Sequence, residues 1–195
     1  VQAALAPESD PRAALGEING TVDRATRLAN QMLALAKVEQ VRQDSAPTPL
    51  DWAPIARDIA LDLAPLVADK KLDFEIQTAP AVVVAHAWML RELTRNLLHN
   101  ALRHSPPGGR LAVTLWANEA SAILRVDDSG PGVAPDMVGR LFQPFAAGGA
   151  NGGTGLGLAI CHEIVTHLGG RIGLTNLEQD GQVLGARAEA VLPAS

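Results

Sequence analysis

The sequence is short of cysteine, of aromatic residues and of long apolar runs. Its 195 residues include one cysteine, no tyrosine and three phenylalanines. A lone Cys161 excludes an internal disulfide and any zinc site built from several cysteines. No apolar run reaches the roughly 18 residues that a membrane-spanning helix needs. The N-terminal stretch VQAALAPESDPR has neither the basic start nor the apolar centre of a signal peptide, so we expect none.

Positive charge is also scarce. The chain carries 16 Lys and Arg against 21 Asp and Glu, for a formal net charge of −5. Because proteins that bind nucleic acid usually show a basic patch, we expect no nucleic-acid partner. The 47% of hydrophobic and 19% of charged residues are ordinary for a globular chain with one core. The first residue is a valine, and we therefore expect a fragment of a longer protein.

The N-terminal part of the chain carries a heptad pattern. Apolar or small residues between Leu15 and Ala36 recur in alternating steps of three and four, which is typical of a coiled-coil seam. Asp10 before Pro11 is a suitable helix start. We expect one long helix over 11–41 that packs against a partner helix, and an ordinary surface helix is the alternative.

A polar segment with two prolines, QDSAPTPLDW at 43–52, divides the chain. It separates a partial helical hairpin over 1–43 from a domain over 48–195. The periodicity then predicts helices over 52–70, 88–104 and 154–168, and strands over 72–78, 81–86, 110–117, 121–128, 171–176 and 184–192. Residues 130–153 are expected to be irregular. This order predicts an α+β fold, a two-layer α/β sandwich with helices on one face of a mixed sheet.

Glycines precede the last predicted helix, in NGGTGLGLAI at 151–160. The stretch is not a P-loop, because no Gly-Lys pair occurs in the chain. It is not a dinucleotide fingerprint either, because no strand precedes Gly153, Gly155 and Gly157. Glycines allow close backbone approach, and a helix N-terminus offers free N–H groups to an anion. Taken alone, a glycine-rich lid without a ligand fits equally well.

Two upstream stretches point to a nucleotide. In NLLHNALRHS, Asn96, Asn100 and Arg103 fall within roughly 60° on one helix face. Two amides and a guanidinium suit a magnesium–phosphate group, and a solvated helix face is the alternative. In VDDSGPGV, Asp128 ends a strand just before a glycine-rich turn. A carboxylate there favours adenine, which presents an amino donor, and a plain turn is the alternative.

A third stretch, LFQPF, holds Phe142 and Phe145, two of the three phenylalanines. A small apolar cluster under a loop, without a functional role, is the alternative interpretation. Together the stretches form an ordered set: an Asn box, D-x-G-x-G, F-x-x-F and G-x-G-x-G within about 60 residues.

This ordered set resembles the ATP-binding domain of bacterial sensor histidine kinases, whose Bergerat-type fold also occurs in type II topoisomerases and mismatch-repair ATPases. The likeness spans residues 48–193, and DRATRLANQMLALAKVE resembles the second helix of the dimerisation and phosphotransfer hairpin. It implies a protein histidine kinase that transfers the γ-phosphoryl of ATP to a histidine and thence to a response-regulator aspartate. It further implies a homodimer formed through the hairpin, in the cytoplasmic portion of a bacterial inner-membrane protein whose membrane segments are missing from this chain.

The resemblance also assigns roles to the motif residues. Catalysis falls to Asn96 and Arg103, and ligation of Mg²⁺ to Asn100. Asp128 would bind the adenine amino group, in a pocket that glycines shape and a lid closes. The nucleotide-binding set is Asn100, His104, Asp128, Gly130, Gly132, Phe142, Phe145, Gly153, Thr154, Gly155, Leu156 and Gly157.

The sequence departs from the family pattern in two places. The family's acceptor histidine lies in an H-E-x-x-x-P box, which this chain lacks and which we expect upstream of Val1. HEIVTH at 162–167 imitates the box without its proline, and we interpret His162 as a surface residue. The fragment alone is therefore not expected to phosphorylate itself. The second departure is a lid without Lys or Arg from Leu141 to Gly170. Transfer of a γ-phosphoryl group requires positive charge that stabilises its negative charge.

One further residue separates transfer from hydrolysis. ATPases of this fold resemble one another in carrying a glutamate four residues before the magnesium asparagine, where this chain has Asn96. An amide cannot act as a general base, so we expect ATP to be kept for transfer. Two alternatives remain: a non-catalytic module that senses nucleotide or binds a partner, and an ATPase of the same fold, which Asn96 disfavours.

Overall fold

The structure is a computed structural model that describes residues 29, 31–33, 46–146 and 154–195. Residue 29 and residues 31–33 are helical, in agreement with the helix expected over 11–41. The rest of that helix, the hairpin over 1–43 and Gly153 lie outside the described residues, and the expectations about them stay predictions. No helix in the described ranges is long and apolar enough to cross a membrane.

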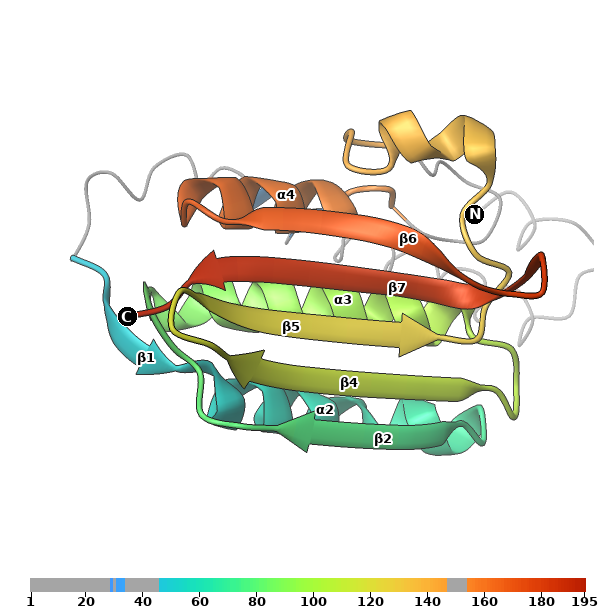
Figure 1. The fold of residues 1–195 in the computed structure, drawn as a ribbon, viewed down its shortest axis with the longest axis horizontal. Coiled ribbons are helices and arrows are strands. Elements are labelled where there is room, and N and C mark those ends of the chain that lie inside the picture. The colour runs from blue at the N-terminus through green and yellow to red at the C-terminus, as the bar shows by residue number, and fades with distance from the viewer. Residues whose placement is uncertain (1–28, 30, 34–45, 147–153) are drawn as a thin grey trace, which may run out of the picture.

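The main domain has two layers (Figure 1). A 5-stranded sheet has the order β2–β4–β5–β7–β6, with β2 parallel to β4 and the other neighbours antiparallel. Its strands are β2 (Asp73–Thr78), β4 (Arg110–Ala117), β5 (Ser121–Asp128), β6 (Arg171–Gln179) and β7 (Gln182–Pro193). Helices α2 (Trp52–Asp69), α3 (Ala87–His104) and α4 (Gly157–His167) cover one face. The predicted α+β sandwich is thus confirmed.

The elements follow from their apolar periods. β4 and β5 alternate buried and more exposed residues, so that Leu111, Val113 and Leu124 enter the core between sheet and helices. α3 buries Leu90, Leu93 and other residues three or four positions apart along one side. The opposite side of α3 is left for polar residues, and this helix carries the Asn box.

α2 and α3 are joined by buried polar contacts as well as by apolar packing. The indole Nε1 of Trp52 donates to Oγ1 of Thr94 at 2.9 Å, and Thr94 donates to the carbonyl of Leu90 at 2.7 Å. Both side chains are fully buried, and each polar hydrogen has a partner. These contacts fix the position of α3 against α2.

Besides small shifts at the ends of other elements, the structure differs from the sequence expectation in three places. Residues assigned to the polar break form β1 (Thr48–Asp51), which pairs with β3 (Val82–Ala85) in a separate 2-stranded sheet. Part of the segment expected to be irregular forms the 3₁₀ helix η2 (Pro135–Arg140). The last helix begins at Gly157 and not at 154, because Gly155 has a φ of +72°, outside the helical region.

Candidate functional site

The polar side of α3 is the first part of the site. Leu97, Leu98 and Ala101 are buried, whereas the predicted motif residues are partly exposed: Asn96, Asn100, Arg103 and His104. The polar stripe inferred from the helical period is therefore confirmed.

Asn96 connects this stripe to the glycine segment. Its Nδ2 donates to the carbonyl of Glu92 at 2.9 Å. Its Oδ1 lies 3.2 Å from the position that a Cβ on Gly157 would take. The N-terminus of α4 therefore lies directly against the Asn box, and a side chain at Gly157 would crowd this contact.

The C-terminal end of α3 is fastened by Lys70, which the sequence interpretation missed. Its Nζ donates to the carbonyls of Leu102, Arg103 and Ser105 at 2.7, 3.1 and 2.9 Å. The last carbonyls of a helix lack partners within the helix, and a lysine satisfies them well. Lys70 thus fixes the backbone that carries Arg103 and His104.

Arg103 and His104 form an electrostatically perturbed pair. Nη2 of Arg103 lies 3.1 Å from Nε2 of His104. Burial lowers the pKa of Arg103. Burial and the charges of Arg103 and Lys70 lower the pKa of His104, which favours the neutral imidazole. Nε of Arg103 is buried and has no hydrogen-bond partner among the described residues, and an anion would complete such a group.

Asp128 lies at the end of β5, next to the end of α3. It is only 7% exposed, and its Oδ1 accepts the Gly130 N–H at 2.8 Å. Burial raises the pKa of Asp128, and backbone hydrogen bonds from Gly130 and Ala186 oppose this rise. A Cβ on Gly130 would come within 2.7 Å of Asp128 Oδ1 and 2.9 Å of the His104 carbonyl. Only glycine fits where the turn passes between these two motifs.

The phenylalanine stretch adjoins the glycine segment. Phe145 donates its N–H to the carbonyl of Gly155 at 3.0 Å, and a Cβ on Gly155 would come within 2.8 Å of Phe145 Cα. The ring of Phe142 lies 5.7 Å from that of His162, which is exposed, as expected of a surface residue.

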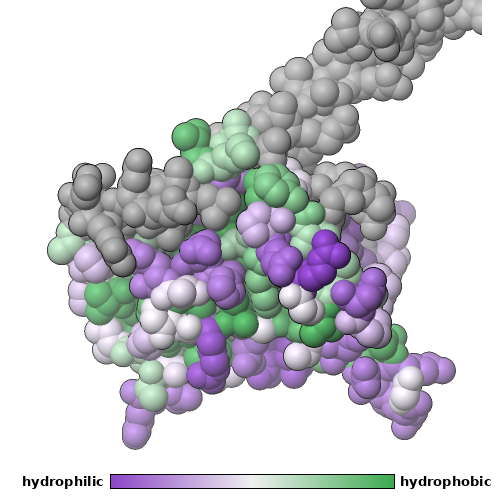
Figure 2. Space-filling model, turned by 90° about the horizontal axis from the view of Figure 1, so that it is seen from above, coloured by the Kyte–Doolittle hydropathy of each residue, from purple (hydrophilic) through white to green (hydrophobic). Residues whose placement is uncertain are grey.

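Seen from above, hydrophobic residues reach the surface between hydrophilic ones (Figure 2). Phe145 and Val138 are 54% and 57% exposed.

Thr154 and Leu156 have different surroundings. Thr154 Oγ1 donates to Oε1 of Gln31, on the N-terminal helix, and accepts the Leu156 N–H at 3.3 Å. Leu156 is only 1% exposed and belongs to the hydrophobic core. Its side chain therefore serves packing, and only its backbone is left for the predicted role at the phosphates.

The comparison with known families decides the class of protein. Residues 86–195 match the family described as "Histidine kinase-, DNA gyrase B-, and HSP90-like ATPase". The chain belongs to this ATPase family. The match begins just before α3 and includes all the motif residues discussed above.

Relatives of this ATPase domain are sensor kinases. The chain is 33% identical over 179 residues to the sensor protein kinase PmrB of Pseudomonas aeruginosa, covering 89% of this chain and 37% of that protein. It is 33% identical over 183 residues to the sensor protein QseC of Escherichia coli K12, covering 89% and 39%. The solved mycobacterial sensor histidine kinase MprB is 30% identical with a TM-score of 0.66, covering 76% of this chain and 97% of that one. The resemblance to sensor histidine kinases is therefore confirmed, and the chain spans about two fifths of the length of the curated relatives.

The ATPase domain has a second residue that sequence reasoning missed, Asn176 of β6. Its Oδ1 accepts the Val133 N–H at 2.6 Å, and its Nδ2 donates to the Val133 carbonyl at 3.1 Å. Val133 follows the D-x-G-x-G motif directly, so Asn176 reaches the motif from the far edge of the sheet. No local signal marks this asparagine, because its partner lies 43 residues away in the chain.

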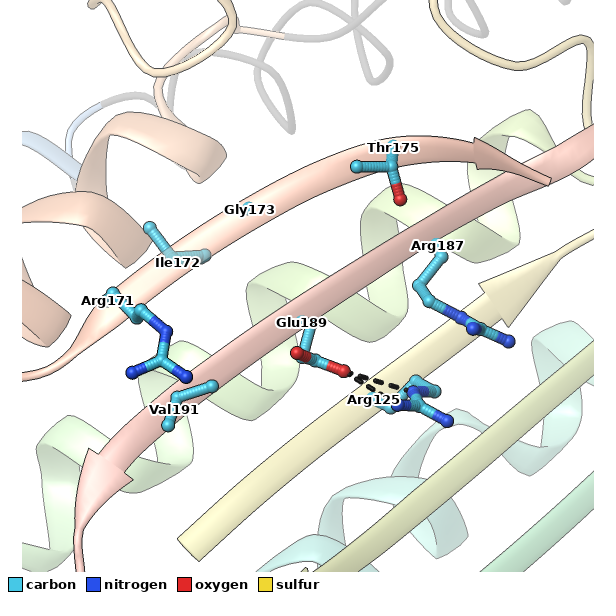
Figure 3. Close-up of a pocket in the computed structure, with 8 residues that line it drawn as sticks. All are labelled: Arg125, Arg171, Ile172, Gly173, Thr175, Arg187, Glu189 and Val191. Atoms are coloured by element: carbon cyan, nitrogen blue, oxygen red, sulfur yellow. Dashed lines mark hydrogen bonds and ion pairs between the residues drawn. The ribbon is translucent and has the colours of Figure 1, made fainter. Parts of the chain in front are cut away.

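A hollow of about 240 Å³ lies on the opposite, open face of the ATPase domain's sheet (Figure 3). Arg125 donates to Glu189 Oε2 from Nε and Nη2 at 3.1 and 2.9 Å. Arg187 makes two bonds to Asp127 at 2.7 and 2.6 Å. These arginines are neutralised by carboxylates on neighbouring strands. The hollow contains none of the four motifs, and the candidate site lies on the helix side.

Proposed function

We propose that this chain is the ATP-binding catalytic part of a two-component sensor histidine kinase. It transfers the γ-phosphoryl of ATP to a histidine supplied from outside this chain, and thence to a response-regulator aspartate. The observation that carries the proposal is the meeting of motifs: Gly130 lies against Asp128 and the end of α3, and Gly157 lies against Asn96. Motifs far apart in the sequence thus surround one region.

Asp128 selects adenine in this proposal. The carboxylate accepts hydrogen bonds from the backbone N–H groups of Gly130 and Ala186, and its remaining lone pairs can accept the adenine amino group. Guanine presents a carbonyl oxygen at the corresponding place and would be repelled by the carboxylate. Because Asp128 is buried, this hydrogen bond is stronger than it would be in water.

The phosphates would bind at the polar stripe of α3 and the glycine segment. Asn100 would hold Mg²⁺ through its amide oxygen, with Asn96 as support, and Arg103 and the backbone of the glycine segment would flank the phosphate oxygens. The residues fit such an ion, because the partly exposed amide of Asn100 offers the kind of oxygen ligand that Mg²⁺ takes in proteins. Mg²⁺ takes the rest of its ligands from phosphates and water, and when bound it offsets the charge of the transferred group.

Asn96 supports transfer over hydrolysis. Its Nδ2 is bound to the Glu92 carbonyl, and its amide cannot remove a proton from water. We infer that the acceptor is a protein side chain and not water. We infer that the hairpin over 1–43 forms a homodimer that brings the acceptor histidine to the site. We also infer that the parent protein is held in a bacterial inner membrane by segments missing from this chain, with this part in the cytoplasm.

A second candidate function is a non-catalytic module that senses a nucleotide or binds a partner. One sequence feature favours it, the absence of Lys and Arg from 141 to 170. A lid without cationic side chains stabilises the negative charge on a transferred phosphoryl group less well.

The decisive experiment uses the longer parent protein. It is incubated with Mg²⁺ and ATP labelled on the γ-phosphorus, beside an Asn100→Ala variant and a variant without the histidine of the upstream box. We expect label on the wild type only, with no steady release of phosphate. Nucleotide binding without label would favour the second candidate. Steady phosphate release from an unlabelled protein would indicate an ATPase, and absence of nucleotide binding would contradict all three functions.

A further inference from the structure

Both polar atoms of the Asn176 side-chain amide form hydrogen bonds to one residue, Val133. Oδ1 accepts the Val133 N–H at 2.6 Å, and Nδ2 donates to the Val133 carbonyl at 3.1 Å. A pair of bonds of opposite sense to one residue fixes both its position and its orientation. Strand β6 carries Asn176 at the edge of the sheet, where it pairs with Ala186 of β7 just before a register shift between Leu177 and Glu178.

The same asparagine also packs against Gly132. This glycine has a φ of +75°, and a Cβ on it would come within 2.7 Å of Asn176 Oδ1 and 2.5 Å of Val183 Cγ1. The turn is held at its other end by the bond from the Gly130 N–H to Asp128. The turn after β5 is therefore pinned twice, by Asp128 at its start and by Asn176 at its finish.

We propose that Asn176 is a positioning residue for the nucleotide base. It acts through Gly132 and Val133, which it holds in place as the wall of the adenine pocket beside Asp128. This inference rests on the proposed nucleotide-binding function. A pocket selects a base by fixed donor and acceptor positions, so a wall that moves costs selectivity as well as affinity.

The test is a calorimetric titration of the whole chain with Mg²⁺ and a non-hydrolysable ATP analogue, repeated with the matching GTP analogue. We expect Asn176→Ala to weaken binding of the ATP analogue by up to about tenfold, because the nucleotide must then order a turn that the asparagine held with about one net hydrogen bond. We also expect it to reduce the preference for the ATP over the GTP analogue. Asn176→Asp keeps the shape and the acceptor but replaces the donor with a charged oxygen that faces the Val133 carbonyl, and it should shift the preference in the same direction.

Asn118 provides a matched control. In the turn between β4 and β5 its Oδ1 accepts the N–H groups of Ala120 and Ser121 at 3.0 and 2.8 Å, so Asn118→Ala also breaks two bonds from a side chain to the backbone. We expect this variant to melt earlier than the wild type but to keep its affinity and base preference. Equal base preference in the wild type and both Asn176 variants would overturn the inference. A wild type that binds neither analogue would overturn the proposed function itself.

A double-mutant cycle adds a second readout. Gly132→Ala places a methyl group against Asn176 Oδ1, so part of its loss in affinity depends on the asparagine. We expect Gly132→Ala to cost less affinity in the Asn176→Ala background than in the wild type. If the affinity losses of the two single variants simply add in the double variant, the contact between Asn176 and Gly132 does not position the pocket wall.

Discussion

Replacing Asp128 by asparagine should weaken nucleotide binding and should raise stability relative to the wild type as the pH rises. Asp128 is 7% exposed, and the Gly130 N–H occupies its Oδ1 at 2.8 Å. In Asp128→Asn the amide oxygen keeps this bond, which turns the NH₂ group toward the place of the adenine amino group. Two donors then face each other, and the acceptor for the base is gone.

The size of the loss follows from the bond that is removed. Hydrogen bonds to charged groups contribute about 1.5–3 kcal/mol, and we take about 2 kcal/mol, or roughly 30-fold in the dissociation constant.

The effect on stability has the opposite sign. Burial raises the pKa of Asp128 above its ordinary 3.8, so the native state binds this proton more readily than the unfolded chain. The contribution of Asp128 to stability is therefore complete below pH 3.8 and is lost as the pH rises through the raised value. Relative to the wild type, Asp128→Asn should gain stability with rising pH across this window.

Calorimetry with Mg²⁺ and a non-hydrolysable ATP analogue measures the affinity, and thermal melts on both sides of the window measure the stability. Asp127→Asn is the matched control, because Asp127 is the neighbouring residue and pairs with Arg187 on the open face of the sheet. We expect it to leave the affinity unchanged. Wild-type affinity in Asp128→Asn, or a stability relative to the wild type that does not rise with pH across this window, would contradict this prediction.

Further predictions concern the end of α3 and the glycine segment. Lys70→Met removes three bonds to helix carbonyls and should lower the free energy of unfolding in urea by about 1–3 kcal/mol. The same change removes a charge that lowers the pKa of His104, so that pKa should rise in an NMR titration, and an unchanged value would contradict the assignment. Gly155→Ala places an alanine in the left-handed region against Phe145, which costs about 1–2 kcal/mol of conformational energy. We expect this variant to bind the ATP analogue several-fold more weakly. Gly173→Ala, which meets nothing within 4 Å, should bind like the wild type.

The sequence was sufficient for elements whose pattern is local and strong. The hairpin of β4 and β5 was predicted to the residue, because alternation and turn signals agree there. β1 was missed because it is short, contains Pro49 and exists only through its pairing with β3, more than 30 positions along the chain. Strand formation that depends on a distant partner leaves little trace in local propensity.

Within the site, motif residues were found and their supports were not. Asp128 and Asn96 belong to recurring patterns, whereas Lys70 and Asn176 act on backbone atoms 33 and 43 residues away. Such contacts are created by the fold and have no signature in sequence. Leu156 illustrates the opposite difficulty: its motif places it at the phosphates, but its side chain is in the core. A motif position does not reveal whether the side chain or the backbone performs the role.

If the Asn box, the turn after Asp128 and the glycine segment form one nucleotide pocket, one ligand must perturb all three. Backbone amides can be followed by NMR while the whole chain is titrated with Mg²⁺ and a non-hydrolysable ATP analogue. We expect the amides of Asn100, Gly130 and Gly155 to shift together, with one midpoint in the micromolar range. Shifts confined to the open face around Arg125, or separate midpoints for the three amides, would contradict it.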